Sequence, residues 1–186
     1  MKQAGYVLVG GRSSRMGRDK ALLPFRGGLL AQSVAREVEQ AAGSVVLVGP
    51  LRYGCAGFPI MPDVFPGEGP LGGILTALQS SGPEWRLVVA CDMPAVTAGF
   101  LRELLGAAED LDADVLLPAG PSGRPEPLCA VYHRRSQQRL YEAFAGGVRK
   151  VTAALGGLRT AIFPVADLAP FQNVNTPEDW AGYASE

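Results

Sequence analysis

Residues 5–20 read GYVLVGGRSSRMGRDK, and they say more about the chain than any other segment. The first part, residues 5–9, is a short apolar run that predicts a buried strand. The second part begins with two adjacent glycines and contains one acid, Asp19, and four cations: Arg12, Arg15, Arg18 and Lys20. A glycine turn that leaves a strand and presents backbone amides together with cations is typical of a polyphosphate site.

The spacing of this segment excludes two common phosphate loops. From Gly11 to Gly17 it is one residue too long for a Walker P-loop, and no Gly-Lys-Ser/Thr follows. The adjacent glycines also differ from the GxGxxG pattern. Lys20 lies just beyond the loop, where its ammonium would reach the same phosphates. The alternative is a basic surface loop without a ligand, because runs of charge usually face solvent.

The composition favours one domain, residues 1–186, that binds a small anion. The net charge of −1 provides no field that would draw the protein to nucleic acid or to a membrane, so we expect neither as a partner. Cys55, Cys91 and Cys129 form no CxxC pair, and no apolar run has the length of a signal-peptide core or of a membrane span. We therefore expect a soluble, cytoplasmic protein with reduced thiols.

Strand and helix patterns alternate along the rest of the chain. Apolar runs predict strands over residues 44–48, 58–61, 87–91, 115–117, 128–132 and 161–165. Helical spacing predicts helices over residues 30–41, 71–78, 100–108, 137–144 and 150–155, and a last one after Thr176-Pro177-Glu178-Asp179. This alternation predicts an α/β fold of three layers, α/β/α, with a mostly parallel central sheet. Such sheets bind ligands at the carboxyl ends of their strands.

Acids and amides at predicted strand and helix ends are further candidates for the site. Asp92 directly follows the strand LVVAC, and there it would either bind Mg²⁺ together with phosphates or cap a turn. Asp63 would contact a nucleotide or the second substrate, or cap its own turn. Asn173 and Asn175 precede the last helix and are ordinary turn residues, metal ligands or substrate contacts. The one histidine, His133, excludes a site made of several histidines.

Five segments together resemble the molybdenum cofactor guanylyltransferases, a family of nucleotidylyltransferases. They are LVGGRSSRMGRDKALLPF (8–25), GPLGGILTAL (69–78), CDMP (91–94), PEPLCAVY (125–132) and NVNTPEDW (173–180), in the order and spacing of that family. The chain departs from the family at Val9, which replaces an alanine. It also reads Val48-Gly49-Pro50 where the family often has an asparagine that contacts guanine, which leaves a CTP-using relative open.

The resemblance implies a single Rossmann-like domain of the nucleotide-diphospho-sugar transferase type. The implied reaction moves GMP from GTP to the terminal phosphate of molybdopterin, or of its molybdenum-bearing form, and releases pyrophosphate with Mg²⁺ as cofactor. The implied nucleotide contacts are Leu8, Val9, Gly10, Gly11, Lys20, Asp63 and Asp92. Arg15 and Lys20 would stabilise the pyrophosphate, Asp92 would hold Mg²⁺, and Asn173 and Asn175 would face the pterin or the metal. Transient contact with proteins that handle the molybdenum cofactor is a further implication.

Other functions remain as alternatives. A related nucleotidylyltransferase would use CTP on the same pterin, or would act on a sugar or polyol phosphate. A catalytically silent nucleotide-binding module would have no need of both Lys20 and Asp92. A dinucleotide-dependent oxidoreductase requires wider-spaced glycines and an acid at a strand end about 20 residues further on. At that distance this chain has Glu37 and Glu39, both in a predicted helix.

Overall fold

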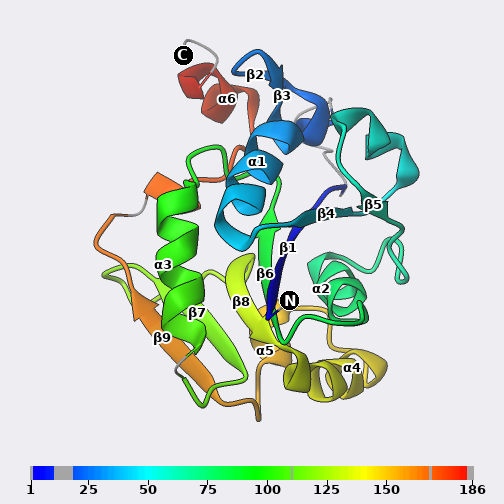
Figure 1. The fold of residues 1–186 in the computed structure, drawn as a ribbon, viewed down its shortest axis with the longest axis vertical. Helices are drawn as coiled ribbons and strands as arrows, with labels where there is room; N and C mark the ends of the chain where they lie inside the picture. Colours follow the sequence, from blue (N-terminus) through cyan, green and yellow to red (C-terminus); the bar gives the residue numbers. More distant parts are fainter. Residues whose placement is uncertain (1, 11–18, 110, 168, 184–186) are drawn as a thin grey trace.

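A seven-stranded sheet forms the middle layer of the protein in a computed structural model that describes residues 2–10, 19–109, 111–167 and 169–183 (Figure 1). Its strands follow the order β5-β4-β1-β6-β8-β7-β9. Their bounds are Gln3–Leu8 (β1), Val45–Val48 (β4), Ile60–Met61 (β5), Trp85–Ala90 (β6), Val115–Ala119 (β7), Cys129–His133 (β8) and Thr160–Pro164 (β9). Each of the predicted strands is therefore present, with shifts of a few residues at the ends.

Within this sheet, β8 alone runs against its neighbours. β1 pairs in parallel with β4 and β6, β4 with β5, and β7 with β9, whereas β8 is antiparallel to β6 and β7. The connection from β7 to β8 contains no helix, and a parallel return would need such a crossover. The predicted mostly parallel sheet is confirmed, and the reversal of β8 brings its first residues to the carboxyl edge of β6.

Helices cover both faces of the sheet. α1 (Leu30–Ala42) and α3 (Ala98–Glu109) pack on one face, and α2 (Pro70–Leu78), α4 (Gln137–Ala145) and α5 (Val151–Ala154) pack on the other. A hydrophobic core lies between the sheet and each helical layer. Among the described residues, no helix is both long enough and apolar enough to cross a membrane. The three predicted layers are thus present.

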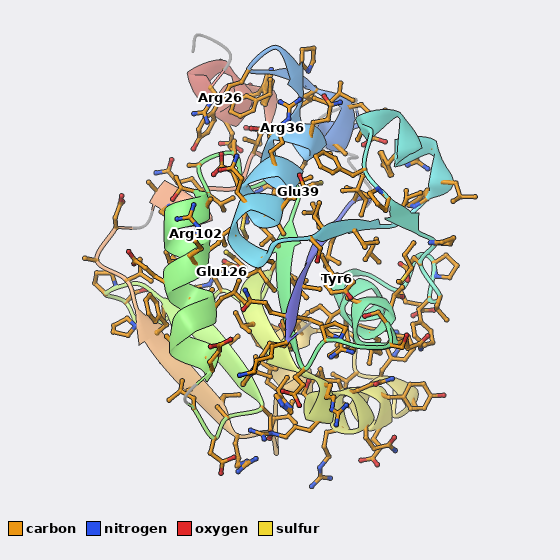
Figure 2. All side chains as sticks on the ribbon, in the orientation of Figure 1. Tyr6, Arg26, Arg36, Glu39, Arg102 and Glu126 are labelled. Atoms are coloured by element: carbon orange, nitrogen blue, oxygen red, sulfur yellow. The ribbon has the colours of Figure 1, made fainter. Side chains whose placement is uncertain are left out.

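α1 shows how its residue pattern produces this packing. Leu30, Val34 and Val38 recur at helical spacing and are buried against the sheet, while Arg36 is exposed on the outer side (Figure 2). Gly43 ends the helix in the left-handed conformation, with a φ of 76°, as its position after the apolar stripe predicts. Burial of one apolar face therefore stabilises the helix more than intrinsic propensity does.

The structure adds short elements that the sequence patterns do not predict. They are the hairpin β2 (Pro24–Phe25) and β3 (Gly28–Leu29) and the 3₁₀-helices Lys20–Leu22 (η1), Leu51–Ala56 (η2), Arg134–Ser136 (η3) and Ala169–Phe171 (η4). Elements of two to six residues contain too little periodicity to be recognised. The strand predicted over residues 115–117 also extends two residues further, because Pro118 and Ala119 continue β7 beside β9.

The last helix packs against this hairpin. α6 (Pro177–Tyr183) lies beside β2 and β3 at one end of the molecule (Figure 1). The ring centroid of Phe25 is 5.8 Å from that of Trp180 and 6.4 Å from that of Tyr183. Aromatic packing therefore fixes the C-terminal helix next to the segment that follows the glycine-rich loop.

Candidate active site

A cleft of about 850 Å³ opens at the carboxyl ends of β1, β4 and β6. The strand ends are linked here, because Val9 N donates to Val48 O at 2.9 Å and Cys91 N donates to Leu8 O at 3.1 Å. Six of the residues singled out from the sequence line this cleft: Leu8, Val9, Gly10, Lys20, Asp63 and Asp92. The general rule for ligand sites in such sheets thus agrees with the observed cavity.

Lys20 and Asp92 form an ion pair in the lining of the cleft. Lys20 Nζ is 3.4 Å from Asp92 Oδ2 and donates to Asn175 Oδ1 at 2.7 Å. The side chains of Lys20 and Asp92 are 17% and 23% exposed, so both remain within reach of a ligand. Because η1, the turn after β6 and the segment before α6 each contribute one of these groups, the site joins parts of the chain that are distant in sequence.

Buried and capping contacts position Asn175. Val174 next to it is fully buried, and Val174 N donates to Asp92 O at 2.9 Å. Asp179 accepts hydrogen bonds from Asn175 N and Thr176 N at 2.8 and 2.9 Å, and these bonds lower the pKa of Asp179. Thr176 Oγ1 in turn accepts from Asp179 N at 3.1 Å, which completes a capping box for α6. The helix start predicted from Thr176-Pro177-Glu178-Asp179 is confirmed.

Asp63 lines the cleft and also caps its own turn. Its Oδ1 accepts from Phe65 N and from Thr76 Oγ1, both at 2.9 Å. The carboxylate therefore ties the turn between β5 and α2 to the buried side of that helix. The two uses considered from the sequence, turn cap and nucleotide contact, are compatible, and the first is observed.

Gly49 brings two strand ends into very close approach. A Cβ built on this residue would lie 1.9 Å from Val9 O, and the φ of 153° also disfavours a side chain. Gly49 lines the cleft at the exit of β4. No asparagine fits at position 49 on this backbone. This steric limit accounts for the departure from the family pattern at the middle residue of 48–50.

Several groups near the cleft were not singled out from the sequence. Tyr53, Arg52 and Asp19 form a hydrogen-bonded cluster beside Lys20. Burial raises the pKa of Glu126, and the negative charge of Asp92 adds to this effect. The Tyr53–Arg52–Asp19 cluster joins residues 34 positions apart, so no local sequence pattern predicts it. Glu126 lies within the PEPLCAVY segment, whose local pattern does not predict that tertiary packing partly buries this acid.

The remaining residues considered from the sequence are Gly11, Arg15, Asn173 and Cys91. Gly11 and Arg15 fall outside the described residues. Asn173 Oδ1 is buried and has no hydrogen-bond partner within the part of the chain that the structure describes. Cys91 is buried, and burial is the main cause that raises its pKa to about 12, so its thiol stays protonated and unreactive.

The donor set suits a Mg²⁺ ion that is bound jointly with phosphates. Among the described residues, no group of three His, Cys, Asp or Glu side chains gathers in one place. Asp92 supplies a carboxylate in the cleft, and Asn173 Oδ1 is an unpaired buried amide oxygen in the segment bonded to Asp92. Mg²⁺ is commonly bound by one or two carboxylates plus substrate phosphates, so these residues fit the ion.

A family model, a curated protein and two solved structures are similar to this chain. The family model described as the MobA-like NTP transferase domain matches residues 5–160. A Deinococcus radiodurans protein named "probable molybdenum cofactor guanylyltransferase" is 33% identical over 175 residues, 94% of this chain and 90% of that protein. Molybdopterin-guanine dinucleotide biosynthesis protein A from Archaeoglobus fulgidus has a TM-score of 0.84 at 28% identity, over 98% of this chain and 97% of that one. CMP:2-keto-3-deoxy-manno-octonic acid synthetase complexed with CTP has a TM-score of 0.78 at 16% identity, over 100% and 98%, and shares the fold alone.

Proposed function

Because the chain belongs to the MobA-like NTP transferase family, we propose that it transfers GMP from GTP to the terminal phosphate of molybdopterin and releases pyrophosphate. At the coarser level it is a nucleotidyltransferase of molybdenum cofactor biosynthesis. The observation that carries the proposal is the convergence of Lys20 Nζ and the Asp92 carboxylate in one cleft at the strand ends.

This transfer needs charge neutralisation and alignment more than covalent chemistry. A phosphate of the pterin attacks the α-phosphorus of GTP in line, so two anions must meet. The attacking phosphate is already ionised at neutral pH, and no side-chain base is required. Lys20 stabilises the charge that develops on the leaving pyrophosphate. Asp92 holds Mg²⁺, which supplies positive charge to the phosphates when it is bound.

The other assigned residues bind the two substrates. The backbone of residues 8–10 lies along the nucleotide, and Asp63, which lines the same cleft, also contacts it. Asn175 is held beside Lys20 and faces the pterin side, together with Asn173. In this proposal Arg15 acts with Lys20 on the pyrophosphate.

A second candidate is the transfer of CMP from CTP to the same pterin. The observation that favours it is Gly49, because a side chain that reads guanine has no room at that position. A protein that shares the fold was solved in complex with CTP, so the fold is compatible with a cytidine nucleotide. GTP is preferred here because the similarity to guanylyltransferases extends over nearly the whole chain.

Pyrophosphate release with each of the four nucleoside triphosphates, molybdopterin and Mg²⁺ tests the proposal. We expect turnover with GTP to exceed turnover with CTP, ATP or UTP by at least about tenfold, a difference of roughly 1.4 kcal/mol in the barrier. GTP with Mg²⁺ should also raise the melting temperature more than the other nucleotides do. Preference for CTP would replace the first candidate with the second, and no release with any nucleotide would reject both.

A further inference from the structure

Tyr53 contacts residues at both ends of the glycine-rich segment. It lies in η2, which follows β4, and its side chain is fully buried. At one end, a Cβ built on Gly10 would be 3.7 Å from Tyr53 Cε2. At the other end, the Tyr53 hydroxyl donates a hydrogen bond of 2.6 Å to Asp19 Oδ2. One rigid side chain therefore packs beside the strand exit and binds the residue that precedes Lys20.

Arg52 completes this cluster. Its Nη2 donates to the Tyr53 hydroxyl at 2.8 Å and lies 3.3 Å from Asp19 Oδ2, while the guanidinium carbon is 4.6 Å from the centre of the Tyr53 ring. The Asp19 carboxylate thus accepts from a hydroxyl and a guanidinium at the same oxygen, in charge-assisted hydrogen bonds. Burial raises the pKa of Tyr53 far above its ordinary value, and Asp19 adds to this, so the hydroxyl stays a proton donor.

Asp19 passes this constraint on to Lys20. The backbone of Asp19 is extended, with φ −73° and ψ 111°, and its carbonyl accepts from Leu22 N at 3.1 Å to begin η1. Asp19 is therefore held through both its side chain and its main chain. Since Lys20 is the next residue and its ammonium is bound to Asp92 and Asn175, the lysine is fixed at its backbone and at its tip.

We propose that Tyr53 and Arg52 are positioning residues for nucleotidyl transfer, which hold Asp19 so that the Lys20 ammonium stays aimed into the cleft. The inference rests on the proposed function, because it assigns Lys20 to the leaving pyrophosphate. Tyr53 and Arg52 act through Asp19 and Lys20 and make no contact with the reacting atoms. A displacement of about 1 Å at a group that stabilises the transition state is enough to lower a rate by roughly a hundredfold.

Tyr53→Phe tests the inference, with Tyr6→Phe as the matched control. Both variants remove one hydroxyl from a buried tyrosine, but Tyr6 lies within β1 and bonds Ser80 beyond the end of α2, and neither residue lines the cleft. We expect Tyr53→Phe to lower kcat by roughly tenfold to a hundredfold, with a smaller change in the KM for the nucleotide. Tyr6→Phe should cost similar unfolding free energy and leave kcat unchanged.

A double-mutant cycle with Lys20→Ala separates positioning from a general structural role. If Tyr53 acts through Lys20, then Tyr53→Phe has no further effect on kcat in the Lys20→Ala background. An equal loss with and without Lys20 would mean that Tyr53 only supports the fold, and it would overturn the inference. Should Tyr53→Phe not fold, Arg52→Gln enters the same cycle, because its half-exposed side chain is removed at little cost in stability.

Calorimetric binding of inorganic pyrophosphate with Mg²⁺ distinguishes the two proposals. We expect the wild-type protein to bind pyrophosphate. Tyr53→Phe should weaken this binding about tenfold when Lys20 is intact, and should have no effect in the Lys20→Ala background. If the wild-type protein turns over and binds pyrophosphate, and Tyr53→Phe does both equally well, the positioning role is overturned and the proposed function stands. A wild-type protein that neither binds pyrophosphate nor turns over would reject the proposed function, and the positioning role with it.

Discussion

Acidic and basic side chains gather at both edges of the central sheet, around Lys20 in the cleft and around Asp114 at the far edge. Asp114 precedes β7, Arg135 follows the antiparallel β8, and Arg159 precedes β9, so these three residues meet where the parallel strands begin. The two clusters contain similar chemical groups. They differ in how completely each charge is satisfied by the protein itself.

Asp114 at the far edge is saturated. Its carboxylate accepts from Arg135 Nε at 2.6 Å, from Arg159 Nη2 at 3.2 Å and from Arg159 N at 2.9 Å, and the residue is 9% exposed. Burial acts to raise the pKa of Asp114, but these hydrogen bonds outweigh it and the pKa is lowered. In the cleft, the Lys20 ammonium, which has three donors, is seen with one carboxylate at 3.4 Å and one amide oxygen among the described residues.

The difference separates a structural cluster from a binding cluster. A carboxylate that already accepts several strong hydrogen bonds gains little from a ligand, and it serves to join strand ends. A cation and an acid at 3.4 Å, both partly open to a cleft, still have capacity for phosphate oxygens and for Mg²⁺. Substitutions in the cleft should therefore affect turnover, and substitutions at the far edge should affect stability.

Asp92→Asn gives the largest effect that we expect. The variant keeps the size of the side chain and a carbonyl for Lys20 but removes the charge that holds the metal. Turnover should fall by roughly a thousandfold, the upper range for loss of one transition-state contact. The measurement is pyrophosphate release over a Mg²⁺ titration. Turnover above a tenth of the wild-type value at any Mg²⁺ concentration would place the metal elsewhere.

Lys20→Ala comes next, with a loss of about a hundredfold in kcat/KM. The ammonium is expected to act on the pyrophosphate, and its removal should leave the unfolding free energy nearly unchanged because the side chain is partly exposed. Lys150→Ala, an exposed lysine before α5, is the matched control. If Lys20→Ala turned over at the wild-type rate, as the control Lys150→Ala should, the cleft cluster would have no role in turnover.

Asp114→Asn should act on stability instead of turnover. The folded protein lowers the pKa of Asp114, so its contribution is complete above the ordinary value near 4 and is lost as the pH falls through the folded pKa. We expect about 2 kcal/mol of destabilisation at pH 7, and convergence of variant and wild type in strong acid. Urea unfolding at both pH values measures this, with the exposed Glu103→Gln as control. If Asp114→Asn lowered kcat under conditions where the variant is fully folded, the purely structural role of the far-edge cluster would be contradicted.

Glu126→Gln should have the smallest effect, and in the opposite direction. The folded protein raises the pKa of Glu126, so the wild type loses stability as the pH rises through that pKa. The neutral glutamine keeps the oxygen that accepts from Leu128 N and avoids the buried charge. The variant should melt about 1–2 °C higher at pH 8 and at the wild-type temperature at acidic pH. If Glu126→Gln melted at a lower temperature than the wild type at pH 8, the negative charge of Glu126 would be stabilising in the folded protein.

The sequence predicts the layers of the fold and the place of the cleft. Continuous apolar runs identify β1 and β6, and the rule that parallel strands end at one edge brings Lys20 and Asp92 together before any coordinates are known. The capping of α6 is also predictable, because Thr176 and Asp179 interact over three residues. Local patterns contain this information.

The supporting contacts of the site are not predictable in the same way. Tyr53 and Asp19 are 34 residues apart, and η2, which carries Tyr53, is too short to show a period. The reversal of β8 depends on the missing helix in its connection, while its own apolar pattern suits either direction. The burial of Glu126 beside the cleft depends on that reversal. These features arise from tertiary packing, which one sequence does not encode locally.

Gly49 limits how the nucleotide preference of this protein can be redesigned. A new base-reading side chain cannot be introduced there without displacing Val9, and its neighbours are already committed: Val48 is buried, and Pro50 Cδ would be 3.1 Å from a Cβ on Gly10. The β4 wall is closed to engineering by single substitutions. A designer who wants another base must work from other lining residues, such as Pro66, because Gly67 has open space around it but a φ of 82° that disfavours a side chain.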